Sequence, residues 1–377
     1  MKKKICIILS ALLVLGVGLG LSLFFGLKGK KQQENNPEEL LSTGLYDDSG
    51  LVRDWENLTT GEEPSITVED NVLIGCDKAL AGELVLPEGI LAIGINAFLE
   101  CNLTKISLPS SLKEVARDAF YNSVELEEVS IPSNSALEVI GYGAFTYCHK
   151  LKTLDIPSTV TKIGVSAFLG CTVLDHIVIP NSITTIGDAL FKDCEALNDL
   201  SYGDITEIGS QAFYNCRSLE SFDFKSTTKI GFSAFWNCKS LANVDLPETL
   251  ELMENHVFAR CNNLTAVTFG SDATRIGVGT FEDCLSLTEV ELPGYLDCVP
   301  EYCFAGCEAL EEVVLGEQII RIGKYAFKDC KNLSINFSAQ GSWGYLDEDR
   351  LVSFDLCGNE LNRKEIIDGK EDRVFEI

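Results

Sequence analysis

The chain has 377 residues, of which 30 are Lys or Arg and 57 are Asp or Glu, so its formal net charge is −27. With 46% hydrophobic and 23% charged residues, the composition excludes a disordered chain and predicts a folded one. Nucleic-acid binding needs a basic surface that neutralises phosphates, so this acidic charge excludes nucleic acid as a partner.

The N-terminus is the only basic part of the chain. Residues 1–4 form a short Lys-rich tail, and residues 5–27 form an uncharged, apolar run. At about 1.5 Å per helical residue this run is long enough to cross a bilayer. Bulky Phe24 and Phe25 stand where a cleavage site needs small residues. We therefore expect a transmembrane signal anchor at 5–27, with a cleaved secretory signal as the alternative.

The location of the remaining chain follows from that anchor. A short N-terminal tail most simply stays inside the cell, which places the rest outside. The predicted location is the cell membrane, crossed once, with the repeat domain facing outside; cleavage would give a secreted protein instead. Residues 28–64 are polar, rich in turn-forming residues and without an apolar period, so they are expected to form a stalk.

A Phe followed three residues later by Cys recurs along the chain and decides the fold. The intervals between successive Phe residues are 22–25 residues. A period of 20–29 residues is typical of a solenoid, in which each unit buries its apolar face against its neighbours. The Phe series is Phe98, Phe120, Phe145, Phe168, Phe191, Phe213, Phe235, Phe258, Phe281, Phe304 and Phe327.

Each unit contains a short strand and a return segment. Leu154 and Ile156 alternate with polar residues, which predicts a strand with one inward face, and Pro157 ends it because proline has no N–H for a ladder. Gly164 allows either a turn with positive φ or a close backbone approach. The Ala-Phe-x-x-Cys stretch at 167–171 is expected to return on the convex side as a short 3₁₀ or irregular segment.

These units predict an α/β-type repeat solenoid that is mostly β, with about 11 repeats and a parallel sheet on the concave side. The pattern L-P-x-x-[LIV]-x-x-I-G-x-x-A-F-x-x-C over residues 67–337 resembles the BspA-like (Treponema pallidum type) leucine-rich repeat family. By this resemblance, residues 65–97 form an N-terminal cap with a hairpin at Asp70-Asn71 and the first coil, and residues 98–337 form the repeats. Residues 338–377 leave the pattern and are expected to form a C-terminal cap. The resemblance also implies a surface or secreted protein that acts in adhesion or partner binding.

Ten of the 15 cysteines occupy the position three residues after the repeated Phe. We interpret them as a buried column of thiols, because a column along an axis cannot bring four ligands together around a metal. Cys298, Cys303 and Cys307 are close enough in sequence to permit zinc or a disulfide as a local alternative. Cys76 and Cys357 flank the solenoid at opposite ends, so we expect each thiol to stay reduced or to pair with another chain. No metal or cofactor is predicted.

The sequence does not predict an enzyme. Its three histidines, His149, His176 and His256, lie in separate units, and the HExxH, GxSxG and GxxxxGK motifs are absent. An open solenoid with short loops also offers few deep clefts.

The concave face is the better candidate for function, because its outward positions carry many acids. An acidic strip there suits a basic protein partner, or a polar ligand bridged by Ca²⁺; the alternative is that the solenoid is acidic everywhere. We therefore expect adhesion or binding of a protein or matrix-like macromolecule, with a structural spacer, a surface-layer component or an intracellular scaffold as alternatives. The candidate partner-binding residues are Glu128, Asp155, His176, Asp199, Asp223, Asp245, Glu289, Glu291 and Glu312.

Overall fold

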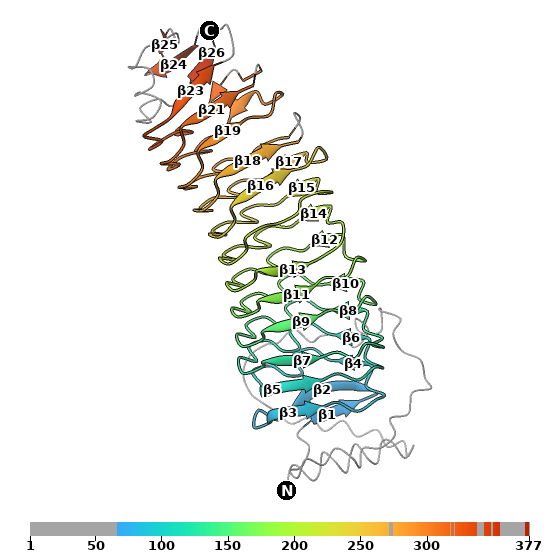
Figure 1. The fold of residues 1–377 in the computed structure, drawn as a ribbon. Helices are drawn as coiled ribbons and strands as arrows, with labels where there is room; N and C mark the ends of the chain where they lie inside the picture. Colours follow the sequence, from blue (N-terminus) through green and yellow to red (C-terminus); the bar gives the residue numbers. More distant parts are fainter. Residues whose placement is uncertain are drawn as a thin grey trace, which may run out of the picture.

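The computed structural model describes residues 66–270, 274–316, 318–319, 321–337, 343–347, 350–354 and 374–376. In this part the chain coils into an elongated stack of strands and turns, with no helix (Figure 1). The structure confirms the predicted repeat solenoid. The predicted tail, anchor and stalk at 1–64 lie outside the described residues. Among the residues that are described, none belongs to a helix that is long and apolar enough to cross a membrane.

Most coils have one longer strand, and these strands lie on one side of the stack; we call them the long ladder (Figure 1). The strands pair in parallel, as expected. Leu154 and its equivalents point inward, while their neighbours along the strand point outward. We call the outward surface of this ladder the strand face. The long ladder consists of a six-stranded sheet, β3 (Ala81–Val85), β5 (Asn102–Ser107), β7 (Glu128–Ser130), β9 (Thr153–Asp155), β11 (His176–Val178) and β13 (Asp199–Ser201), and a five-stranded sheet, β16 (Asn243–Leu246), β18 (Ala266–Phe269), β19 (Glu289–Glu291), β21 (Glu312–Leu315) and β23 (Ser334–Phe337).

A second ladder of strands, which the sequence analysis did not predict, lies on the other side of the stack (Figure 1). Most of its strands have only two residues, and we call it the short ladder. It begins with the expected hairpin, in which β1 and β2 pair antiparallel around Asp70 and Asn71. Its strands are β1 (Ile66–Glu69), β2 (Val72–Cys76), β4 (Ala92–Ile93), β6 (Glu114–Val115), β8 (Val139–Ile140), β10 (Lys162–Ile163), β12 (Thr185–Ile186), β14 (Glu207–Ile208), β15 (Lys229–Ile230), β17 (Leu252–Met253), β20 (Cys298–Val299) and β22 (Arg321–Ile322).

Three further strands follow the last coils. They are β24 (Trp343–Asp347), β25 (Arg350–Phe354) and β26 (Val374–Glu376). β26 pairs antiparallel with both β22 and β24, and β24 pairs antiparallel with β25.

The Ala-Phe-x-x-Cys segments are irregular turns. In every unit the residues two before and two after the repeated Phe have positive φ, for example Ser166 at 57° and Gly170 at 72° around Phe168. Two left-handed residues per turn prevent a regular helical segment. The N–H of each Phe except the last donates to a carbonyl in the next coil, at 2.7–3.1 Å, which makes a third column of bonds that we call the turn ladder.

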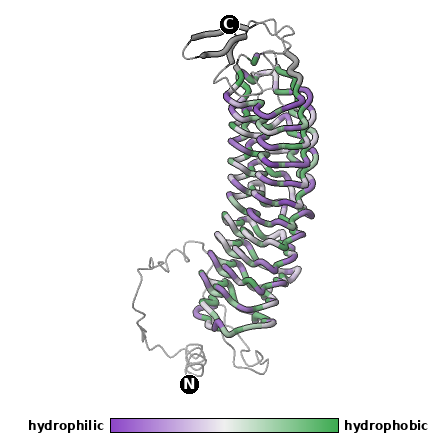
Figure 2. The backbone as a smooth tube through the Cα atoms, turned by 90° about the vertical axis from the view of Figure 1, so that its left-hand side faces the viewer, coloured by the Kyte–Doolittle hydropathy of each residue, from purple (hydrophilic) through white to green (hydrophobic). Residues whose placement is uncertain are grey.

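The core contains the predicted column of phenylalanines. Successive rings from Phe98 to Phe327 stack with centroids 4.9–5.8 Å apart and planes within 21° of parallel. Each coil alternates between hydrophobic stretches and hydrophilic ones (Figure 2). The repeated Phe and Cys side chains are buried between the coils.

In most coils the repeated glycine serves the close backbone approach rather than a positive φ. A Cβ on Gly164 would lie 2.4 Å from the backbone N of Tyr142 in the preceding coil, so no larger residue fits without displacement. Its φ is not in the left-handed region.

The ladders are interrupted at different coils. The long ladder is broken between β13 and β16, where the short ladder runs unbroken from β12 to β17. The short ladder is broken between β10 and β12, where the long ladder runs unbroken from β3 to β13, and again between β17 and β20, where the long ladder runs unbroken from β16 to β23. The turn ladder passes all three breaks.

Candidate functional site

Eight of the nine predicted partner-binding residues lie on strands of the long ladder. Their side chains alternate with buried residues and therefore belong to the strand face. They do not form one continuous cluster, because, among the residues whose structure is described, a cation, Lys105, lies on a strand of the first half of the face and none lies on the strands of the second half.

His176 brings two predicted carboxylates together. It begins β11, and its Nδ1 lies 2.7 Å from Asp199 on β13 while its Nε2 lies 3.4 Å from Asp155 on β9. The carboxylates are 71% and 82% exposed, whereas the imidazole is 30% exposed. The three side chains form a polar bridge across three neighbouring strands.

Glu128 is also engaged within the face. Its carboxylate is 2.9 Å from Lys105 on the neighbouring strand and accepts a 2.7 Å bond from the hydroxyl of Ser130. The hydrogen bond from Lys105 lowers the pKa of Glu128, and the same contact raises the pKa of Lys105. The first strands of the face therefore carry acids that are largely matched by a cation or by His176.

The second half of the strand face is acidic without such matches. Glu289 on β19 stands directly opposite Glu312 on β21 in the parallel register, and Glu291 follows on the same strand. A hollow of about 970 Å³ at the start of these strands is lined by Thr288, Glu289, Glu311, Glu312 and Asn332. Asp245 on β16 accepts a 2.7 Å bond from the hydroxyl of Thr268. Among the described residues, no cation lies within ion-pair distance of Asp245, Glu289, Glu291 or Glu312. We call these four residues the acidic half.

The prediction for Asp223 was wrong in one respect, because this exposed residue is not on a strand. The hydroxyl of Tyr202 accepts a 2.6 Å bond from the Asp223 N–H, which takes the place of strand pairing. Burial raises the pKa of Tyr202 to about 12, so the phenol remains protonated. The unit is also short: from Leu154 to Ile163 there are nine positions, but from Phe222 to Ile230 only eight.

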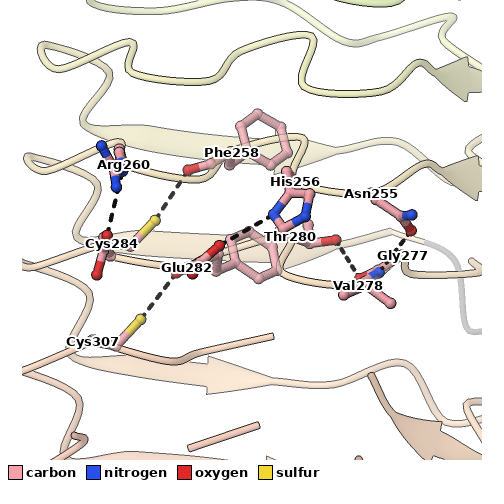
Figure 3. Close-up of polar contacts among 12 residues, drawn as sticks. Asn255, His256, Phe258, Arg260, Gly277, Val278, Thr280, Glu282, Cys284 and Cys307 are labelled. Atoms are coloured by element: carbon pink, nitrogen blue, oxygen red, sulfur yellow. Dashed lines mark hydrogen bonds and ion pairs between the residues drawn. The ribbon is translucent and has the colours of Figure 1, made fainter. Parts of the chain in front are cut away.

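The other two histidines make local contacts outside the strand face. In the part of the chain that the structure describes, no group of three or more His, Cys, Asp or Glu side chains is placed to hold a metal ion. His149 contacts the carbonyl oxygen of Gly170, and His256 pairs with Glu282 at 3.2 Å on the turn side, away from the strand face (Figure 3).

Sequence reasoning missed a stacked group on the turn side. The rings of Tyr214 and Trp236 stack with centroids 4.4 Å apart. Lys192 lies 4.8 Å from the Tyr214 ring centre, and Arg260 lies 5.1 Å from that of Trp236. These are cation–π distances. The sequence contained a signal for this group, because Lys192, Tyr214 and Trp236 each directly follow a repeated Phe and therefore occupy the same position in successive coils.

The sequence matches the family model described as "BspA type Leucine rich repeat region" in six copies, over residues 68–198 and 204–337. A leucine-rich repeat protein from Bacteroides ovatus is similar in structure, with a TM-score of 0.60 and 27% identity over 73% of this chain and 81% of that chain. A leucine rich cell surface protein from Faecalibacterium prausnitzii has a TM-score of 0.48 and 23% identity, over 75% of this chain and 97% of that chain. None of the curated proteins matches the chain.

Proposed function

Because the chain belongs to the family of proteins with a BspA-type leucine-rich repeat region, we propose that its strand face binds a macromolecular partner. Leucine-rich repeat proteins act generally in protein interaction or at surfaces. Their stacked strands give an extended surface, which suits a protein better than a small molecule.

The observation that carries this proposal is the acidic half. Like charges that stand opposite one another without a cation, such as Glu289 and Glu312, are unfavourable within the free protein. A bound cation removes that repulsion, and a Lys- or Arg-rich segment of a protein supplies several at once. The partner that fits best is therefore a protein with an exposed basic segment.

The location remains part of the proposal. We propose that residues 5–27 anchor the chain in the cell membrane and that the solenoid faces outside, where such a partner is accessible. Protease added to intact cells should remove the repeats. Protection of the repeats until the cells are lysed would instead support the intracellular scaffold.

The binding test compares two charge-matched variants of the full chain. The first carries Glu289→Gln, Glu291→Gln and Glu312→Gln. The control carries Glu138→Gln, Glu248→Gln and Glu251→Gln, which are exposed acids away from the strand face. Both variants lose three negative charges, so any difference between them reports position rather than total charge.

Binding of a lysine-rich peptide is then measured by titration calorimetry. Exposed charge pairs contribute about 0.2–1 kcal/mol each, so the strand-face variant should bind roughly tenfold more weakly while the control is unchanged. Equal weakening of both variants would show that only net charge matters. That result would sink the strand-face proposal and favour the structural spacer.

A further inference from the structure

Two cysteines near the N-terminal end of the solenoid have their sulfur atoms in contact. Cys76 is the last residue of β2, and Cys101 ends the first Phe-x-x-Cys turn. Their Sγ atoms are 3.4 Å apart although the residues are 25 positions apart in sequence. Both thiols are free, and the contact of Cys76 with Cys101 was not predicted from the sequence.

This contact differs from those of the equivalent cysteines. From Cys148 to Cys330, each thiol of the column donates to the carbonyl oxygen of a Phe in the preceding coil, at 3.0–3.2 Å, as Cys284 does to Phe258 in Figure 3. Phe98 is the first of the series, so Cys101 has no earlier Phe carbonyl. The carbonyl oxygen of Leu80 lies 3.7 Å from the Cys101 sulfur, and the Cys76 thiol provides its second sulfur contact.

We propose that Cys76 and Cys101 are a dithiol pair that closes to a disulfide and covalently joins the N-terminal hairpin to the first repeat. A disulfide has a sulfur–sulfur distance of about 2.0 Å, so the two atoms must approach by about 1.4 Å. The inference does not depend on the proposed function of the strand face.

The chemistry of the two thiols supports this role. The hydrogen bond from Cys76 lowers the pKa of Cys101 to about 7, with further help from the N–H groups of Leu103 and Asn102, and the same bond raises the pKa of Cys76. In the column, by contrast, burial raises the pKa of thiols such as Cys171 and Cys238. A thiolate is the reactive form of cysteine, so this pair is chemically distinct from the column.

Closure needs an oxidant, and a small-molecule disulfide such as oxidised glutathione supplies it. The partly exposed Cys76 releases its proton to the solvent, and its sulfur attacks the glutathione disulfide and expels a glutathione thiolate, which takes up a proton from the solvent. The Cys101 thiolate then attacks the Cys76 sulfur, forms the protein disulfide and expels the second glutathione. Two protein thiols are oxidised as one glutathione disulfide is reduced.

The test treats the full chain with oxidised glutathione, blocks the remaining thiols and maps the digested peptides by mass spectrometry. The expected product is one linked pair of peptides that contain Cys76 and Cys101. In the Cys101→Ser variant, glutathione should remain attached to Cys76, because the second thiol is missing. Serine is suited to this site, because Ser123 occupies the equivalent position in the next coil. The control Cys148→Ser should still form the Cys76–Cys101 link.

Several results would overturn the inference. They are a native chain that takes up no oxidant at Cys76, one in which glutathione stays on Cys76, and one in which Cys76 joins Cys6, Cys357 or a second chain. A second readout is hydrogen exchange of the β1 and β2 amides, which should slow on oxidation of the native chain but not of Cys101→Ser. Equal exchange rates before and after closure would show that the link does not fasten the hairpin.

Discussion

The hydroxyl of Ser123 donates a 2.6 Å hydrogen bond to the carbonyl oxygen of Phe98. Nine other coils place a cysteine thiol against the corresponding carbonyl, at longer distances. The side chain at this position is therefore a buried hydrogen-bond donor as well as a small core residue.

This relationship predicts that Cys238→Ser is tolerated better than Cys238→Ala. Serine keeps a donor for the Phe213 carbonyl, whereas alanine removes it and leaves a small void. The alanine variant should lose about 1–2 kcal/mol of unfolding free energy. Urea unfolding of the two variants measures the difference. Equal loss in both would mean that size alone matters at this site.

Phe213→Ala should destabilise the solenoid by about 3–5 kcal/mol. The ring is fully buried and stacks on Phe191 and Phe235, so its removal opens a cavity that adjacent coils cannot fill. Phe232→Ala is the control, because that ring is 41% exposed and its loss leaves no internal cavity. Thermal unfolding should separate them clearly, and comparable losses would contradict the interior column.

Gly164→Ala and Gly187→Ala should differ although both glycines follow the repeated Ile. A Cβ at 164 would lie 2.4 Å from the Tyr142 backbone, and such overpacking costs about 1–3 kcal/mol. A Cβ at 187 meets nothing closer than 3.9 Å. That variant should be neutral or slightly stabilised, because alanine restricts the unfolded chain. Chemical denaturation of the pair tests this, and a destabilised Gly187→Ala would contradict it.

Glu88 should make the first coils sensitive to acid. Its carboxylate accepts bonds from the Ser110 N–H, the Ser110 hydroxyl and the Ser111 N–H, and the first of these contributes most to lowering its pKa. A lowered folded-state pKa gives stability that is present above the unfolded value, about 4.3, and that is lost as pH falls through the folded value. Hydrogen-exchange protection of the first coils, taken relative to the intrinsic exchange rate at each pH, should therefore fall on acidification less in Glu88→Gln than in the native chain. An identical acid response in both would exclude this contribution.

The sequence was sufficient to predict the features that recur from unit to unit, such as the buried Phe and Cys columns. Phe168 and Cys171 recur at a fixed interval, so their burial in columns follows from stacking alone. The short ladder was not predictable in the same way, because a strand such as Lys162-Ile163 is too short to show an alternation of period 2. Gly164 marked the close approach but left positive φ as an equal alternative.

The candidate face was predictable in outline and not in its contacts. Period-2 alternation placed Asp155, His176 and Asp199 outward, but their mutual distances depend on strand register and side-chain rotamers. Asp223 departs from the pattern although the preceding unit, which is equally short between Leu200 and Ile208, still forms β13. The 22-residue intervals around Phe213 marked both short units but did not indicate which of them would lose its strand. Which acids of the strand face lack a cation partner could be decided only from the three-dimensional positions of the lysines.

The staggered interruptions of the ladders bear on how the protein responds to cleavage. The first sheet of the long ladder ends at β13, and the exposed Asp204 follows in a segment without strand structure. Across this point β12 still pairs with β14, Phe191 still donates to the Ala212 carbonyl at 2.8 Å, and the rings of Phe191 and Phe213 still stack. A protease cut at Asp204 would therefore yield two fragments that stay together as one particle and separate only under denaturing conditions.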